Sequence, residues 1–184
     1  MGCSESLLAH ENEFVRTHCK GFAWIGPNMP YSTRCDESPG SPPLEIWEFL
    51  RAGFRGPTAK QFIAEQVPGI FRTDMNPLDA RVLQFFERLA VQADPLALER
   101  MITVMRRPMH EELTRFVDAC GETGKKPVLI LHGDSDAGMP VEVSAARVKE
   151  IVPWADLKVY ENAGHGKQSI SWRDEAPFQE SRKY

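Results

Sequence analysis

The sequence predicts an α/β fold built around a parallel sheet. Two apolar segments have the length of strands, residues 127–131 and 157–160, and a helical pattern over 143–152 joins them. A strand, a helix and a second strand at this spacing form a unit in which the two strands are parallel. A third short strand is expected at 21–25, where a Gly-Pro pair ends it. We therefore expect a parallel sheet of about three strands.

Helices and a loop surround the first strand. Residues 4–16 are expected to be helical, with Leu7, Leu8, Phe14 and Val15 on roughly one face. After the strand, residues 28–43 are rich in Pro, Ser and Gly, which is typical of a loop.

The segment 44–120 has helical periodicity throughout, and we expect four or five short helices with no strand between them. Three patterns mark helix starts. Thr58 and Gln61 have the spacing of a capping box, and Asn76 and Asp94 each stand before a proline at the first helical position. The last of these helices is expected over residues 109–120.

Composition restricts the class of protein. The chain has 184 residues, of which 42% are apolar, and its mean hydropathy is −0.37, values typical of one soluble globular domain. The longest apolar run, residues 127–131, is far too short to span a bilayer. A net charge of −4 argues against nucleic acid as the main partner, because phosphate binding needs a basic surface. Nothing in the sequence identifies a partner protein.

The cysteines and the first residues bear on localisation. The four cysteines are widely spaced and form no CxxC pair, so we expect free thiols in a cytoplasmic protein. No secretory signal is evident. An alternative interpretation is lipid attachment, because Gly2 and Ser6 fit the N-myristoylation pattern and Cys3 would be a neighbouring palmitoylation site.

Two polar segments, residues 131–136 and 161–166, stand at the ends of the expected strands 127–131 and 157–160. The carboxyl ends of parallel strands meet at one edge of the sheet, which places Asp136 and His165 together. There the carboxylate would bond one imidazole nitrogen and leave the other free as a base. A purely structural role of Asp136 and His165 in turns is the alternative.

A metal site is a further alternative, with His132, Asp134, Asp136 and His165 as ligands. We expect neither a metal nor a cofactor, because the sequence holds no further cluster of ligands.

The segments 129–140 (LILHGDSDAGMP) and 162–165 (NAGH) resemble the α/β-hydrolase superfamily, in its esterase, haloperoxidase and epoxide-hydrolase-like branch. The resemblance implies that Asp136, rather than Asp134, is the acid of a catalytic triad and that His165 is its histidine. It implies a partial α/β-hydrolase fold: a core of residues 1–30 and 121–166 and an inserted helical cap of residues 31–120. Residues 167–184 would be a polar tail.

The family's nucleophile stands in a G-x-S-x-G turn between a strand and a helix. The resemblance aligns the first three residues with those that follow the serine, so we expect the nucleophile before Met1 and a truncated sequence. A second alignment uses residues 2–6 as the turn, with Ser4 as the candidate nucleophile, although no strand precedes it.

The resemblance implies a hydrolase of a small, apolar, ester-like organic molecule. His165 would act as the base and Asp136 would orient it, whether the nucleophile is Ser or, as in epoxide or haloalkane hydrolases, Asp. The alternative is a non-catalytic α/β-hydrolase-like binding or regulatory protein, or an inactive fragment, because a triad without its nucleophile forms no acyl-enzyme.

Overall fold

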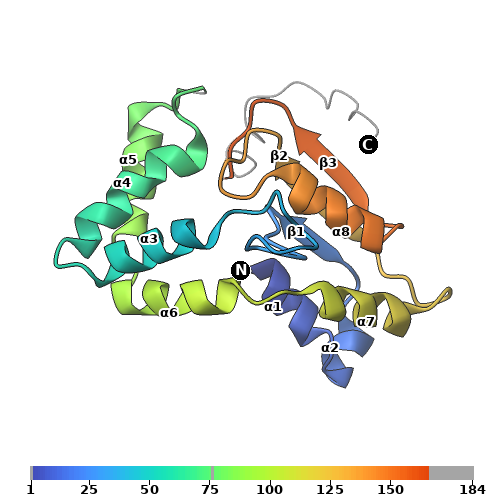
Figure 1. Ribbon diagram of the computed structural model, residues 1–184. Coiled ribbons are helices and arrows are strands. Elements are labelled where there is room, and N and C mark those ends of the chain that lie inside the picture. The colour runs from blue at the N-terminus through green and yellow to red at the C-terminus, as the bar shows by residue number, and fades with distance from the viewer. Residues whose placement is uncertain (1, 76, 166–184) are drawn as a thin grey trace.

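A three-stranded parallel sheet lies beside a group of helices (Figure 1). The computed structural model describes residues 2–75 and 77–165 of the chain. The strands are β1 (Phe22–Ile25), β2 (Val128–Gly133) and β3 (Asp156–Tyr160), in the order β1-β2-β3. Both pairings are parallel, with Phe22 opposite Val128 and Leu129 opposite Asp156. The expected α/β class with three parallel strands is confirmed.

Five helices lie between β1 and β2, at the upper limit of the expected number. The helices are α1 (Gly2–Ala9), α2 (Glu13–His18), α3 (Leu44–Arg55), α4 (Ala59–Phe71), α5 (Ala80–Ala90), α6 (Pro95–Met105), α7 (His110–Cys120) and α8 (Ala145–Ile151), and a 3-10 helix covers Val141–Val143. Helices α3–α6, here called the helical part, gather on one side of the molecule, and the sheet with α1, α2, α7 and α8 forms the other side (Figure 1).

The expected single helix over residues 4–16 is wrong, because the chain breaks between α1 and α2. The side chain of Asn12 accepts hydrogen bonds from the amides of Phe14 at 3.0 Å and Val15 at 3.4 Å. Asparagine competes well for the free amides at a helix start, so it begins a new helix rather than continuing the old one.

The expected helix starts in the helical part have different outcomes. Asp94 caps α6, accepting from the amides of Leu96 at 2.8 Å and Ala97 at 3.2 Å, which confirms this start. Thr58 precedes α4 but makes no capping bond through its side chain, so the expected capping box is wrong. Asn76 lies outside the described residues, and α5 begins instead at Ala80, after the cap residue Asp79.

Helices α1, α7 and α8 cover one face of the sheet. Trp24 of β1 and Ile130 of β2 point into this core, where Leu113 of α7 and Val148 of α8 are fully buried. Although α7 belongs to the range expected for the cap, it therefore packs with the sheet. The opposite face is less covered by the described residues, since the side chain of Ile25 is 50% exposed.

A second apolar cluster ties the helical part to the loop that follows β2. Trp47 of α3 and Ile102 of α6 pack there with Met139, which lies three residues after Asp136. The indole of Trp47 also donates to the carbonyl of Ser32 at 3.0 Å. This packing fixes the loop that carries Asp136.

Two further findings concern the whole described chain. None of its helices is both long and apolar enough to cross a bilayer. All four cysteines are free thiols.

Candidate active site

The loops that follow β2 and β3 are held together by their backbones. The amide of Asp134 donates to the carbonyl of Tyr160, and the amide of Ser135 donates to that of Ala163, each at 3.0 Å. Gly133 permits this approach, because a Cβ at that position would lie 2.1 Å from the oxygen of Ala163. The two loops predicted to carry the site therefore meet at one edge of the sheet.

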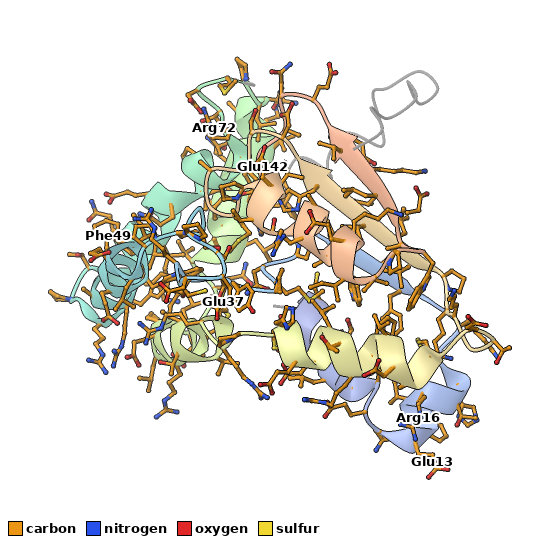
Figure 2. The ribbon with its side chains drawn as sticks, turned by 45° about the vertical axis from the view of Figure 1, so that its right-hand side comes forward. Glu13, Arg16, Glu37, Phe49, Arg72 and Glu142 are labelled. Carbon is orange, nitrogen blue, oxygen red and sulfur yellow. The ribbon has the colours of Figure 1, made fainter. Side chains whose placement is uncertain are left out.

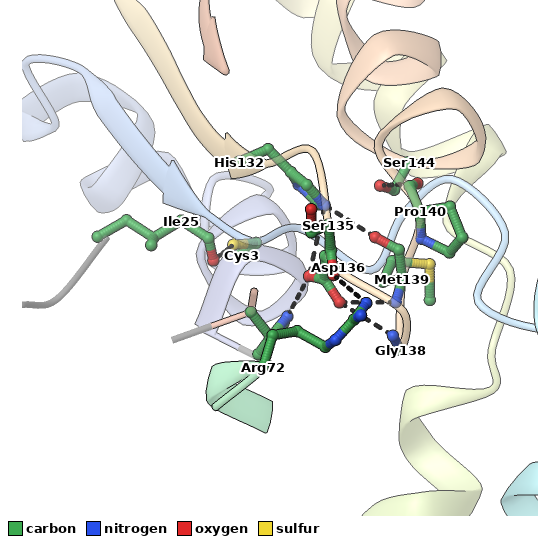
Figure 3. Close-up of polar contacts among 11 residues, drawn as sticks. Cys3, Ile25, Arg72, His132, Ser135, Asp136, Gly138, Met139, Pro140 and Ser144 are labelled. Carbon is green, nitrogen blue, oxygen red and sulfur yellow. Dashed lines mark hydrogen bonds and ion pairs between the residues drawn. The ribbon is translucent and has the colours of Figure 1, made fainter. Parts of the chain in front are cut away.

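Asp136 and His165 are brought into direct contact. His165 Nδ1 lies 2.6 Å from Asp136 Oδ2. Asp136 Oδ1 accepts from the amides of Gly138 at 3.1 Å and Met139 at 2.9 Å (Figure 3). The side chain of Asp136 is only 1% exposed. Burial acts to raise the pKa of this carboxyl, but the hydrogen bond from His165 and the backbone donors outweigh it, so the pKa lies below its usual range.

The geometry fixes the tautomer of His165. An ionised carboxylate only accepts hydrogen bonds, so Nδ1 carries the hydrogen and Nε2 keeps a free lone pair. The side chain of His165 is 47% exposed in the part of the chain that the structure describes. Its ring lies against Gly26, where a Cβ would lie 2.9 Å from Cε1. The result is an oriented base.

His132, which the sequence suggests only as a metal ligand, is a further member of the site. Its ring is fully buried, with Nε2 lying 2.8 Å from the carbonyl of Met139 and 3.5 Å from Asp136 Oδ2 (Figure 3). Because a carbonyl only accepts, Nε2 carries the hydrogen, and Nδ1 has no hydrogen-bond partner among residues 2–75 and 77–165. Burial lowers the pKa of His132, so the ring is neutral. The alternation of β2, in which Val128, Ile130 and His132 share a face, is the signal that could have identified it.

Comparisons with known proteins agree with this fold. No family model matches the chain. A non-heme chloroperoxidase of Kitasatospora aureofaciens is 30% identical over 152 residues, covering 74% of this chain and 48% of that protein. The structure of a bromoperoxidase from Bacillus anthracis matches with a TM-score of 0.70 at 24% identity, covering 82% of this chain and 52% of the other. An α/β-hydrolase enzyme from a Medee basin deep-sea metagenome library matches with a TM-score of 0.61 at 16% identity, covering 94% and 58%.

The chain belongs to the α/β-hydrolase superfamily. It spans about half the length of the relatives it matches, and so carries part of their fold. An esterase from Exiguobacterium antarcticum shares the same fold, with a TM-score of 0.71 at 18% identity, covering 88% of this chain and 57% of that one.

Ser4, the candidate nucleophile of this α/β-hydrolase chain, lies in the first turn of α1. Its hydroxyl donates to Asn28 Oδ1 at 3.3 Å, and no hydrogen bond joins it to His165 within the described residues. The same turn lies beside the end of β1, because the thiol of Cys3 is 3.6 Å from the carbonyl of Ile25. The structure thus places Ser4 near the end of β1, which Gly26 follows, without pairing it to His165.

The metal interpretation gains no support from the geometry. Asp134 accepts a hydrogen bond from the hydroxyl of Ser135 at 2.9 Å, and its carboxylate takes no part in the bonds between Asp136 and His165. Over residues 2–75 and 77–165, no group of three or more His, Cys, Asp or Glu side chains is arranged to hold a metal ion.

Proposed function

We propose that this chain carries the acid–base part of a hydrolase active site, with His165 as general base and Asp136 as the residue that orients it. The observation that carries the proposal is the 2.6 Å contact between His165 Nδ1 and the buried carboxylate of Asp136. Ligands bind at the carboxyl ends of strands in open α/β sheets, where both residues lie.

The proposed chemistry follows from the tautomer of His165. Nε2 takes the proton of an attacking hydroxyl, and the ring becomes an imidazolium. The carboxylate of Asp136 stabilises that positive charge, because it is ionised and held in place by two amides. The imidazolium then passes its proton to the leaving group, which leaves the hydroxyl acylated. A water molecule deprotonated by the same Nε2 then cleaves that acyl bond, which releases the acid and restores the hydroxyl.

The proposed substrate is a small, apolar, ester-like organic molecule. The relatives include a chloroperoxidase and a bromoperoxidase as well as an esterase, and these names stand for different reactions. The choice of an ester bond as the bond that is cleaved is therefore part of our proposal. The side chains of Ile70 and Met75, at and just after the end of α4, are exposed and apolar, which suits such a substrate. The proposed cap comprises α3–α6, since α7 packs on the sheet.

The nucleophile of the proposed reaction is Ser4 or a group outside the described residues. If it is Ser4, the hydroxyl has to leave Asn28 and turn toward His165. A serine-reactive fluorophosphonate probe distinguishes the two: labelling that the Ser4→Ala variant abolishes identifies Ser4.

The test of the proposed function is hydrolysis of p-nitrophenyl esters of short acyl chains. We expect His165→Ala to abolish hydrolysis, Asp136→Asn to lower kcat/KM by about 10²–10⁴-fold, and Asp134→Asn to leave it unchanged. Hydrolysis that is independent of His165, or equally sensitive to Asp134, would contradict the proposal.

A second candidate function is binding without catalysis. It is favoured by one observation, the hydrogen bond of Ser4 to Asn28 in place of one to His165. An intact chain that binds a p-nitrophenyl ester without hydrolysing it, and that takes up no fluorophosphonate, would support this alternative.

A further inference from the structure

The end of α4 packs directly against the loop that carries His165. A Cβ added at Gly164 would lie 2.8 Å from the carbonyl oxygen of Ile70, 3.0 Å from the carbonyl carbon of Phe71 and 2.9 Å from Cγ of Arg72. No side chain fits in such a space, so the backbone of Gly164 lies directly against the backbone at the end of α4 and the side chain of Arg72. The helical part therefore touches the residue that directly precedes His165.

Arg72, which ends α4, is held in a defined conformation at this contact. Its φ of 52° is left-handed, which residues other than glycine seldom adopt. Its guanidinium binds both carboxylate oxygens of Asp74, at 2.9 Å from Nε and 3.0 Å from Nη2. A two-point contact of this kind fixes the plane of the guanidinium. The side chain is 25% exposed.

The remaining nitrogen of Arg72 reaches the loop that carries Asp136. Nη1 donates to the carbonyl of Ser135 at 3.2 Å, and the amide of Ser135 donates to the carbonyl of Ala163 at 3.0 Å. Ser135 is therefore bonded at once to the helical part and to the His165 loop, and it directly precedes Asp136. Figure 3 shows Arg72 beside Ser135 and Asp136, and Figure 2 shows Arg72 on the side of the helical part that faces the strand ends.

We propose that Arg72 is a positioning residue for the Asp136–His165 pair. It joins three segments that are distant in sequence: the end of α4, the loop after β2 and the loop after β3. Through this junction the placement of the helical part sets the distance and orientation of His165 relative to Asp136. A ligand that shifts α4 would thereby alter the base. The role rests on the proposed function, because a positioned base matters only if His165 acts as one.

The alternative use of Arg72, direct binding of an anionic substrate, is disfavoured by its contacts. The carboxylate of Asp74 already neutralises the guanidinium, and the pKa of Asp74 is lowered chiefly by its hydrogen bond from Arg72. The third nitrogen is occupied by Ser135. The positive charge of Arg72 is thus paired within the junction between α4 and the two loops.

The experiment follows the Nδ1 proton of His165 by NMR, in the full chain, as a signature of its bond to Asp136. Arg72→Gly keeps the left-handed backbone available and removes the guanidinium, Arg72→Lys keeps the charge and removes the fork, and Arg88→Ala on α5 is the control. We expect this proton to exchange with solvent about tenfold faster in both Arg72 variants and at the normal rate in the control. Amides of β2 should keep their protection, which separates positioning from unfolding.

Unchanged exchange of the His165 proton in the folded Arg72→Lys variant would overturn the proposal. If Arg72→Gly fails to fold, the exchange rate of the His165 proton in Arg72→Lys and Asp74→Asn tests the proposal instead, because each of these variants leaves the backbone of α4 intact. The readout needs no turnover. Failure of ester hydrolysis would therefore overturn the proposed function without affecting this test. Unchanged exchange of the His165 proton would overturn the positioning role without affecting the test of the proposed function.

Discussion

The imidazole of His165 lies so close to Gly26 that no Cβ fits between them, and Gly26 has a φ of +53°. Replacing Gly26 with Ala introduces a left-handed non-glycine residue and a Cβ only 2.9 Å from Cε1 of the ring. We expect Gly26→Ala to lower the free energy of unfolding by more than the roughly 1–2 kcal/mol that a left-handed alanine costs. We also expect it to displace the ring of His165. Urea unfolding measures the first effect, and the imidazole carbon signals of His165 measure the second.

Gly121, which also has a positive φ, provides the control for the effect on the ring of His165. Its φ is +52°, but a Cβ there meets nothing within 4 Å. Gly121→Ala should therefore show the backbone cost alone and leave the His165 signals unchanged. Equal effects of the two substitutions on the His165 signals would show that Gly26 does not position the ring.

His132 makes a prediction about acid stability. Burial lowers its pKa from the ordinary value of 6.5, so the folded state takes up this proton less readily than the unfolded state. The stability that neutral His132 contributes is therefore fully present above about pH 6.5 and is lost as the pH falls toward the folded-state pKa. Gln does not titrate, so we expect the unfolding free energy of the His132→Gln variant to fall less steeply with pH over this window than that of the parent. The difference in slope should be up to about 1.4 kcal/mol per pH unit.

The measurement is the unfolding free energy as a function of pH. His10 is the comparison, because burial also lowers its pKa, and His10→Gln should reduce the same slope independently. A His132→Gln protein whose acid slope equals that of the parent would mean that His132 is not held neutral in the folded state.

The two expected caps of the helical part differ in what they do, and this difference can be measured. Asp94 accepts two amide hydrogen bonds at the start of α6, whereas Thr58 makes none through its side chain. We expect Asp94→Ala to lower the unfolding free energy by about 1 kcal/mol and Thr58→Ala to change it by less than about 0.5 kcal/mol. Comparable losses in the two variants would contradict the capping assigned here.

The proximity of Asp136 and His165 could be predicted from the sequence because it depends on short stretches of the chain. Asp136 and His165 each follow an apolar strand, and neighbouring parallel strands bring their ends together whatever the rest of the chain does. The break in the expected helix over residues 4–16 was missed because the capping bonds of Asn12 outweigh a continuous apolar face. Capping by a single side chain does not change the spacing of the apolar residues, so hydrophobic periodicity does not reveal it.

The contacts that surround the pair could not be predicted. The bond from Arg72 to Ser135 joins positions 63 residues apart, and it depends on how α4 packs against the loops. The role of His132 likewise depends on where the chain places the carbonyl of Met139. Neither contact leaves a spacing pattern in the sequence, because both arise from the packing of separate elements.

Nitrogen-15 NMR of the imidazole reads the tautomer of His165 without any substrate, and so shows whether Asp136 orients the ring. At mildly alkaline pH we expect the hydrogen of the neutral ring to reside on Nδ1, and we expect Asp136→Asn to abolish this preference while Asp134→Asn preserves it. A ring that carries its hydrogen on Nε2, or a tautomer that Asp136→Asn leaves unchanged, would show that Asp136 does not orient His165 as a base.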